Sequence, residues 1–145
     1  KWAKYGAGDD PERYRANIGT YYPIHATGSG LAILSAYPRE RVEAVVDERG
    51  LSAPTDHTIT DREDLFAELD RTRERGYAVG DRYYAEGLRS VGRAVTAPDG
   101  TVIGALSVSG PTYRIDGPVR DREVPRALAA VVESLEGELR SVPET

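Results

Sequence analysis

The sequence predicts a single α/β (α+β) domain in which a mostly antiparallel sheet is flanked by helices. Three observations lead to this fold class. The 145 residues suffice for one domain of ordinary size. Two apolar runs flank the turn signal Pro98-Asp99-Gly100, a pattern typical of an antiparallel hairpin. Along the chain, the predicted elements follow the order β, β, α, α, α, β, β, β, α.

Each element follows from local signals. Proline at 38 separates two amphipathic helical patterns, and Gly50 is placed to end the second of them. The next helix follows the capping-box pattern Thr60-Asp61-Arg62-Glu63, with Thr60 as the expected cap, and Gly76 ends it. The last helix carries an apolar stripe of Val124, Leu128, Val131, Val132, Leu135 and Leu139. The expected strands lie at 2–5, 13–18, 77–79, 88–97 and 101–109. The expected helices lie at 28–37 and 39–49, after the capping box up to 75, and at 121–140.

Composition narrows the function classes. The 24 acidic residues outnumber the 19 Lys and Arg, and the net charge of -5 opposes nucleic-acid binding by this chain itself. The absence of cysteine excludes disulfides, thiolate catalysis and cysteine metal sites, and two histidines disfavour a histidine metal centre. No apolar run reaches the length of a membrane span and no signal peptide opens the chain. We therefore expect a cytoplasmic protein without membrane contact, cofactor or metal.

The basic residues are almost all arginine, because Lys1 and Lys4 are the only lysines. An acidic surplus with little lysine indicates either a high-salt, halophilic cytoplasm or the codon bias of a GC-rich genome. The start at Lys1-Trp2, without an initiator methionine, suggests a piece of a longer polypeptide.

The first candidate site is the run His25-Ala26-Thr27-Gly28-Ser29-Gly30, directly before a helical pattern. A helix N-terminus offers backbone N–H groups and the positive end of the dipole to a carboxylate or phosphate. The alternative is that Thr27 or Ser29 only caps the helix. His25 itself is expected to be a hydrogen-bonded packing residue.

The second candidate site is a serine patch on the hairpin. If the hairpin loop holds an even number of residues, Ser90 lies beside Ser109 and Gly92 beside Ser107, all on one face of the sheet. An odd loop would remove the patch. Small residues and hydroxyls there would leave room for a small polar acid, or would let a helix pack closely. No Ser/His/Asp set and no carboxylate pair indicates an enzyme.

These residues resemble a known family. The run from Pro23 to Ala32 is similar to Pro-Leu-His-Ala-Thr-Ala-x-Gly-Lys-Ala of the C-terminal effector-binding domain of IclR-type transcriptional regulators. Further landmarks follow in order over residues 5–139: Thr58-Ile59-Thr60-Asp61, Arg73-x-x-Gly76-Tyr77-Ala78, Gly87-Leu88-Arg89, Asp99-Gly100 and Ala105-Leu106-Ser107-Val108-Ser109-Gly110-Pro111 with Arg114.

The resemblance implies a GAF-like fold with a six-stranded, mostly antiparallel sheet. It also implies homodimers or homotetramers, and a winged helix-turn-helix DNA-binding domain that is absent from residues 1–145. A small, often acidic, organic effector would lie between the sheet and the helix start. The expected effector-binding residues are Thr27, Gly28, Ser29, Gly30, Leu88, Ser90, Ala105, Ser107 and Ser109.

The chain departs from the family pattern at several positions. Leu31 replaces a lysine, Ser90 a frequent cysteine, and Thr27-Gly28 stands for Thr-Ala. Gly80 stands where an acidic run is common. These departures leave open a different effector, a partly closed pocket or a purely structural role, and the composition resembles members from halophilic archaea. We expect a non-catalytic ligand sensor; a free-standing GAF-like sensor or interaction module is the alternative, and a hydrolase using Ser29 or Ser107 ranks third.

Overall fold

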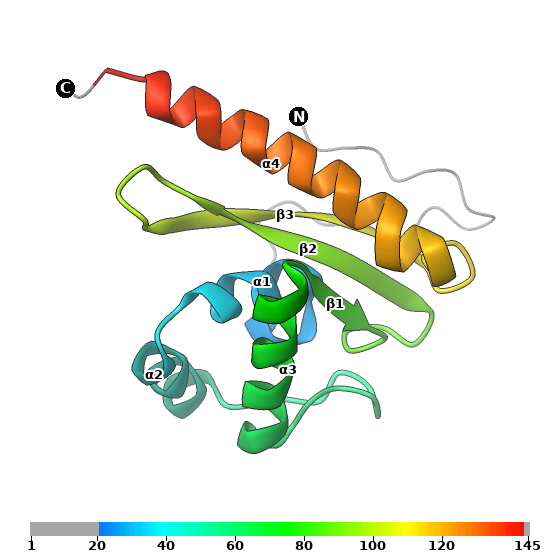
Figure 1. Ribbon diagram of the computed structural model, residues 1–145. Coiled ribbons are helices and arrows are strands. Elements are labelled where there is room, and N and C mark those ends of the chain that lie inside the picture. Colours follow the sequence, from blue (N-terminus) through cyan, green and yellow to red (C-terminus); the bar gives the residue numbers. More distant parts are fainter. Residues whose placement is uncertain (1–20, 144–145) are drawn as a thin grey trace.

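The computed structural model describes residues 21–143 and has an α+β fold (Figure 1). The strands expected at 2–5 and 13–18 lie outside the described residues, so the six-stranded sheet stays a prediction. The described part contains a three-stranded antiparallel sheet in the order β1-β2-β3. Its elements are the 3-10 turn η1 (Ile24–Ala26), α1 (Gly28–Ala36), α2 (Arg39–Arg49), α3 (Arg62–Arg75), β1 (Ala78–Asp81), β2 (Leu88–Thr96), β3 (Val102–Pro111), the π-helical turn η2 (Val119–Glu123) and α4 (Val124–Ser141).

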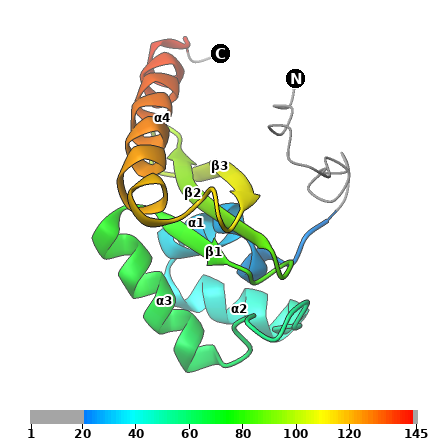
Figure 2. The same cartoon turned by 90° about the vertical axis from the view of Figure 1, so that its right-hand side faces the viewer.

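The sheet lies between two helical layers. Figure 2 shows α1, α2 and α3 on one face and α4 on the other. The larger core joins the three helices to the first face through side chains such as Leu31, Leu65 and Leu69, none of which is exposed to solvent. A smaller core of Val91, Ile115 and Leu128 lies beneath α4. The layered arrangement with helices on both faces agrees with the sequence prediction.

The hairpin register places the four predicted patch residues opposite one another. Ser90 pairs with Ser109, and Gly92 pairs with Ser107, as predicted. The tip itself is odd: Ala97 N–H donates to Thr101 O across a three-residue loop that ends in Gly100 at φ +89°. A β-bulge between Val95 and Thr96 leaves one extra residue on β3 and restores the register. The pairing expected for an even loop is therefore present, but the loop is odd, and the bulge that compensates for it was not predicted.

Two helix starts differ from prediction. Helix α3 is capped by Asp61, whose carboxylate accepts the N–H of Asp64, so the expected Thr60 capping box does not form. Helix α4 begins at Val124 and not at 121. Pro125 is the reason, because it has no N–H for the carbonyl of Asp121 and its ring would clash with that carbonyl in a continuous α-helix.

One stripe residue of α4 and one strand boundary also differ. Val131 is 54% exposed, while Leu128 and Val132, one turn apart, are buried against the sheet. The contact of α4 with the sheet therefore runs through Leu128 and Val132, and Val131 lies outside it. Strand β1 extends to Asp81 and not only to Val79, because Gly80 and Asp81 pair with Ser90 and Arg89.

Replacing Gly92 by alanine is expected to destabilise the fold by about 1–3 kcal/mol, the usual cost of overpacking. A Cβ there would lie 2.4 Å from the carbonyl oxygen of Gly28, so α1 and β2 would have to separate. Gly104→Ala on the adjacent strand is the control, because nothing lies within 4 Å of its Cβ, and its stability should change by about 0.5 kcal/mol at most. Urea unfolding measures both variants, and equal losses would contradict the prediction.

Candidate functional site

The start of α1 lies directly against strand β2. The backbone N–H of Gly28 donates a buried hydrogen bond of 2.9 Å to Ser90 Oγ. Thr27 is the N-cap of α1, and its Oγ1 accepts the N–H of Gly30 at 3.0 Å. The fold thus brings the helix start and the first serine of the patch together, and Thr27 has the capping role that the sequence left as an alternative.

Glycines from two other elements lie against Ser90. A Cβ on Gly28 would lie 2.8 Å from Ser90 Oγ, and a Cβ on Gly80 would lie 2.6 Å from the same oxygen. Gly92 approaches the carbonyl of Gly28 equally closely. In this part of the predicted site, small residues allow a helix to pack tightly on a sheet, which was the second alternative.

The remaining expected residues of the site lie on β3, except Leu88 on β2 and Ser29 on α1. Ser107 is exposed, Ser109 and Leu88 are half-buried, and Ala105 packs against the core of the helical layer. Ser29, in the first turn of α1, is half-buried. The predicted site therefore has a close-packed half around Ser90 and an accessible half along β3.

Two surface hollows occur elsewhere on the described part of the chain. One of about 510 Å³ lies between the end of α1, the start of α2 and α3, where Phe66 and Leu69 line it. The other, of about 360 Å³, lies beside Arg73, Arg93 and Glu136 and reaches Gly92. Neither is lined by Ser90, Ser107 or Ser109.

The loop between β1 and β2 (82–87) is bound to the loop between α2 and α3. Thr55 Oγ1 donates to the carbonyl of Arg82 at 2.6 Å, and Thr58 Oγ1 donates to the carbonyl of Tyr83. His57 Nε2 lies 2.7 Å from Glu86 Oε1 at the surface. His57 is therefore paired with Glu86. These contacts connect the helical layer to the end of the sheet where Gly80 and Leu88 lie.

Three other side chains of the described part of the chain have packing roles. His25 is buried, and its Nε2 lies 2.7 Å from the carbonyl oxygen of Ser52, which confirms the expected hydrogen-bonded packing residue. Tyr83 packs against the larger core, and burial raises the pKa of its hydroxyl above the usual value. Tyr84 makes an edge-to-face contact with Tyr22 at 4.9 Å between ring centroids.

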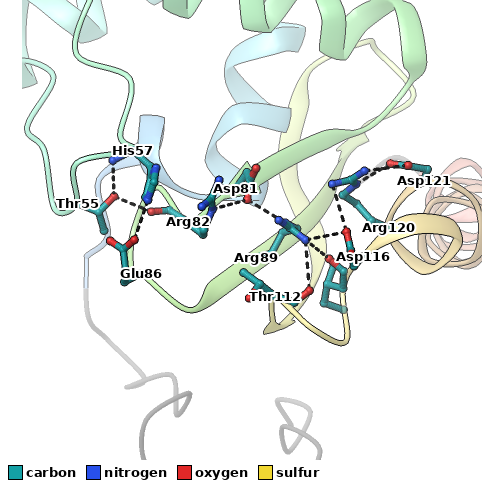
Figure 3. A network of polar contacts seen from close by, with 11 residues as sticks. Thr55, His57, Asp81, Arg82, Glu86, Arg89, Thr112, Asp116, Arg120 and Asp121 are labelled. Carbon is teal, nitrogen blue, oxygen red and sulfur yellow. Dashed lines mark hydrogen bonds and ion pairs between the residues drawn. The ribbon is translucent and has the colours of Figure 1, made fainter.

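A network centred on Arg89 ties the strands to the segment after β3 (Figure 3). The Arg89 side chain is 10% exposed, and its Nε donates to Asp81 Oδ1 at 2.9 Å. Its Nη1 donates to the carbonyl of Ile115 at 2.7 Å, with longer bonds to Thr112 and Asp116. Figure 3 shows the contacts continuing from Asp116 through Arg120.

Asp81 Oδ1 also accepts a hydrogen bond from Nε of Arg82, at 3.1 Å. Burial of this carboxyl opposes its ionisation, but the hydrogen bonds and charges of Arg89 and Arg82 outweigh burial and lower the pKa of Asp81. Sequence reasoning missed this network. The available signal was an arginine near the start of a predicted strand of the hairpin, since an arginine needs partners when it is buried.

Among residues 21–143, no group of three His, Asp or Glu side chains is placed to hold a metal ion. Over the same described range, none of the helices has the length and apolarity needed to cross a membrane. The nine expected effector-binding roles remain predictions.

Residues 7–135 match the family model described as "Bacterial transcriptional regulator IclR C-terminal". The chain is 33% identical over 103 residues to the HTH-type transcriptional repressor AllR of Escherichia coli K12, and 39% identical over 103 residues to the acetate operon repressor of Salmonella typhimurium. Each alignment covers 71% of this chain and 38% of the relative, so the chain spans about two fifths of the length of these curated relatives.

Solved structures show the same architecture. The C-terminal domain of the E. coli regulator KdgR has a TM-score of 0.78 and 30% identity, covering 84% of this chain and 74% of that one. Thermotoga maritima IclR has a TM-score of 0.80 and 26% identity, covering 86% and 50%. The Acinetobacter PobR inducer-binding domain, a double mutant in complex with 3-hydroxybenzoic acid, has a TM-score of 0.74 and 27% identity, covering 83% and 69%.

Ser90→Ala is expected to destabilise the chain by about 1–3 kcal/mol, because the buried N–H of Gly28 loses its acceptor. The matched control is Ser107→Ala on the neighbouring strand. Because the Ser107 hydroxyl is exposed, its loss should change the free energy of unfolding by about 0.5 kcal/mol at most. Denaturant titration compares the two. A larger loss for Ser107→Ala would show that the Ser90 bond does not hold α1 to the sheet.

Acid is expected to weaken the Arg89 network. Because the folded-state pKa of Asp81 is lowered, its contribution is present above the unfolded value of about 3.9 and is lost as pH falls through the folded value. Asp81→Asn should therefore cost about 1 kcal/mol at pH 7 and flatten the fall in stability below about pH 4. Asp70→Asn, at a 69% exposed carboxylate paired with Arg73, is the control. Parallel stability curves for wild type and Asp81→Asn from pH 5 to 2 would refute the assignment.

Proposed function

This chain belongs to the family of C-terminal effector-binding domains of IclR-type transcriptional regulators, and from that membership we propose that it senses a small organic acid. The family consists of transcriptional regulator domains and not of enzymes. Effector binding would change operator binding by a winged helix-turn-helix domain of the same regulator. DNA contact would occur only through that domain, in a cytoplasmic homodimer or homotetramer.

The observation that carries this proposal is the position of the α1 N-terminus beside the serine-bearing strands. The Gly28–Ser90 bond holds the positive end of the α1 dipole against the face on which Ser107 and Ser109 lie. A carboxylate near Ser29 would meet that positive end, and the hydroxyls of β3 would bind its polar substituents. The PobR domain solved with 3-hydroxybenzoic acid supports this chemical class.

The proposed roles differ between the two halves of the site. Ser90 positions the helix start, because its hydroxyl is already bonded to Gly28. Thr27, Ser29 and Gly30 form the anion-facing turn, Ser107 and Ser109 contact the ligand, and Leu88 and Ala105 form the wall. A ligand that also used the Gly28 N–H would have to displace Ser90 Oγ, and this competition would favour ligands that bind along β3.

The response would be a shift between two arrangements of the assembly. An effector can shift that equilibrium only by the difference between its affinities for the two states. The relatives named as HTH-type repressors favour this function over a free-standing sensor or interaction module. The relatives named above are bacterial, and similarity to members from halophilic archaea stays a prediction.

A thermal-shift screen of small organic acids, with 3-hydroxybenzoic acid among them, tests the proposal. At a concentration of about 100 times Kd, a ligand should add about 2.7 kcal/mol and raise Tm by several degrees. Ser107→Val should reduce that shift, whereas Ser52→Val, at an exposed loop position, should leave it unchanged. A panel without any stabilising acid, or a shift that survives Ser107→Val and Ser109→Val, would overturn the proposed site.

A further inference from the structure

The turn that precedes α4 has an unusual backbone pattern. In η2 the N–H of Val124 bonds the carbonyl of Val119, five residues back. Such π-helical turns are rare, and they are frequent at functional sites. This turn also separates α4 from the 112–118 segment that Arg89 holds.

Pro125 explains why the helix does not simply continue through this turn. A regular α-helix would need an N–H at 125 to bond the carbonyl of Asp121, and proline has none. The hydroxyl of Tyr77 instead reaches that carbonyl, at 3.4 Å. The backbone connection between η2 and α4 is therefore weaker than an uninterrupted helix would provide.

Side chains supply the missing connection. Arg120 of η2 makes two hydrogen bonds to Asp121, at 2.8 and 3.1 Å, and lies 3.7 Å from Asp116. Asp116 also accepts Nη1 of Arg89 at 3.3 Å, and its carbonyl accepts the N–H of Val119. Besides Ile115, which packs in the smaller core, the 112–123 segment is thus held by a nearly buried arginine that originates in strand β2 (Figure 3).

The other end of the network reaches a second unusual backbone. Arg82 has φ +63°, a left-handed conformation that costs a non-glycine residue about 1–2 kcal/mol. Its N–H donates to Leu88 O, its carbonyl accepts Thr55 Oγ1, and its guanidinium bonds Asp81. One carboxylate, that of Asp81, therefore joins this loop to Arg89.

We propose that η2 is a conformational joint whose order depends on the Arg89 network and not on the helix backbone. Loss of the network would release residues 112–123 while α4 stays folded. A change at the β1–β2 end of the sheet would reach the α4 layer through Asp81, Arg89 and Asp116. This inference does not require a ligand, so it stands or fails separately from the proposed effector site.

Hydrogen–deuterium exchange of the 145-residue chain, followed by mass spectrometry of its peptides, tests the joint. Arg89→Met should raise exchange over 112–123 about tenfold and leave 128–141 within about twofold of wild type, because local opening and global unfolding are separate events. Arg93→Met is the matched control: Arg93 is on the same face of β2, and its Nη1 donates to the carbonyl of Gly76. An unchanged 112–123 segment, or an equal rise throughout α4, would overturn the proposal.

Pro125→Ala provides the second arm. An alanine N–H can bond the carbonyl of Asp121, so 119–123 should become a continuation of α4 and exchange more slowly. In this background, Arg89→Met should have a much smaller effect on 119–123, and an undiminished effect would overturn the joint. If Arg89→Met does not fold, Asp116→Ala tests the joint in its place. The Asp116 side chain is 65% exposed, so this variant is expected to fold. It should raise exchange over 112–123 about threefold, and no local rise would refute the proposal.

Discussion

The structure depends on one close approach, that of α1 to strand β2. The hydrogen bond from Gly28 N–H to Ser90 Oγ is possible only because glycine stands at 28, 80 and 92, where any Cβ would overlap its neighbours. This contact fixes the distance between the helical layer and the sheet. It also determines which part of the serine face stays accessible, so the same packing that stabilises the fold limits where a ligand can enter.

Arg89 has a comparable role on the opposite face. A buried guanidinium is stable only when its donors are bonded, and here its partners come from β1 and from the segment after β3. The domain therefore has its larger apolar core on the side of α1, α2 and α3, and on the α4 side a smaller apolar core with the ionic contacts of Arg89 beside it. Both faces of the sheet are held by apolar packing, and the α4 side depends in addition on the ionic contacts of Arg89.

Much of the architecture could be predicted from the sequence. The spacing of apolar residues predicted the hairpin and the helices to within a few residues. Burial of one face of a strand or helix imposes that spacing on the sequence. The pairing of Ser90 with Ser109 was one of two registers that the sequence left open, and the β-bulge, which the pattern does not signal, decides between them. The Asp81–Arg89 pair could not be predicted, because the two residues meet only after β1 and β2 align. The expected start of the last helix at 121 was wrong, although a proline at 125 is typical of the first turn of a helix.

The bulge on β3 has a consequence for how this hairpin can change during evolution. A one-residue deletion at the tip would, by itself, turn every side chain of one strand to the opposite face. The extra residue of the bulge lies on β3, opposite Val95 and Thr96. Its loss or gain would compensate for a one-residue change in loop length and keep the side chains on the same faces. Homologous hairpins should therefore vary in length by paired events, one at the tip and one at the bulge, with the serine face preserved.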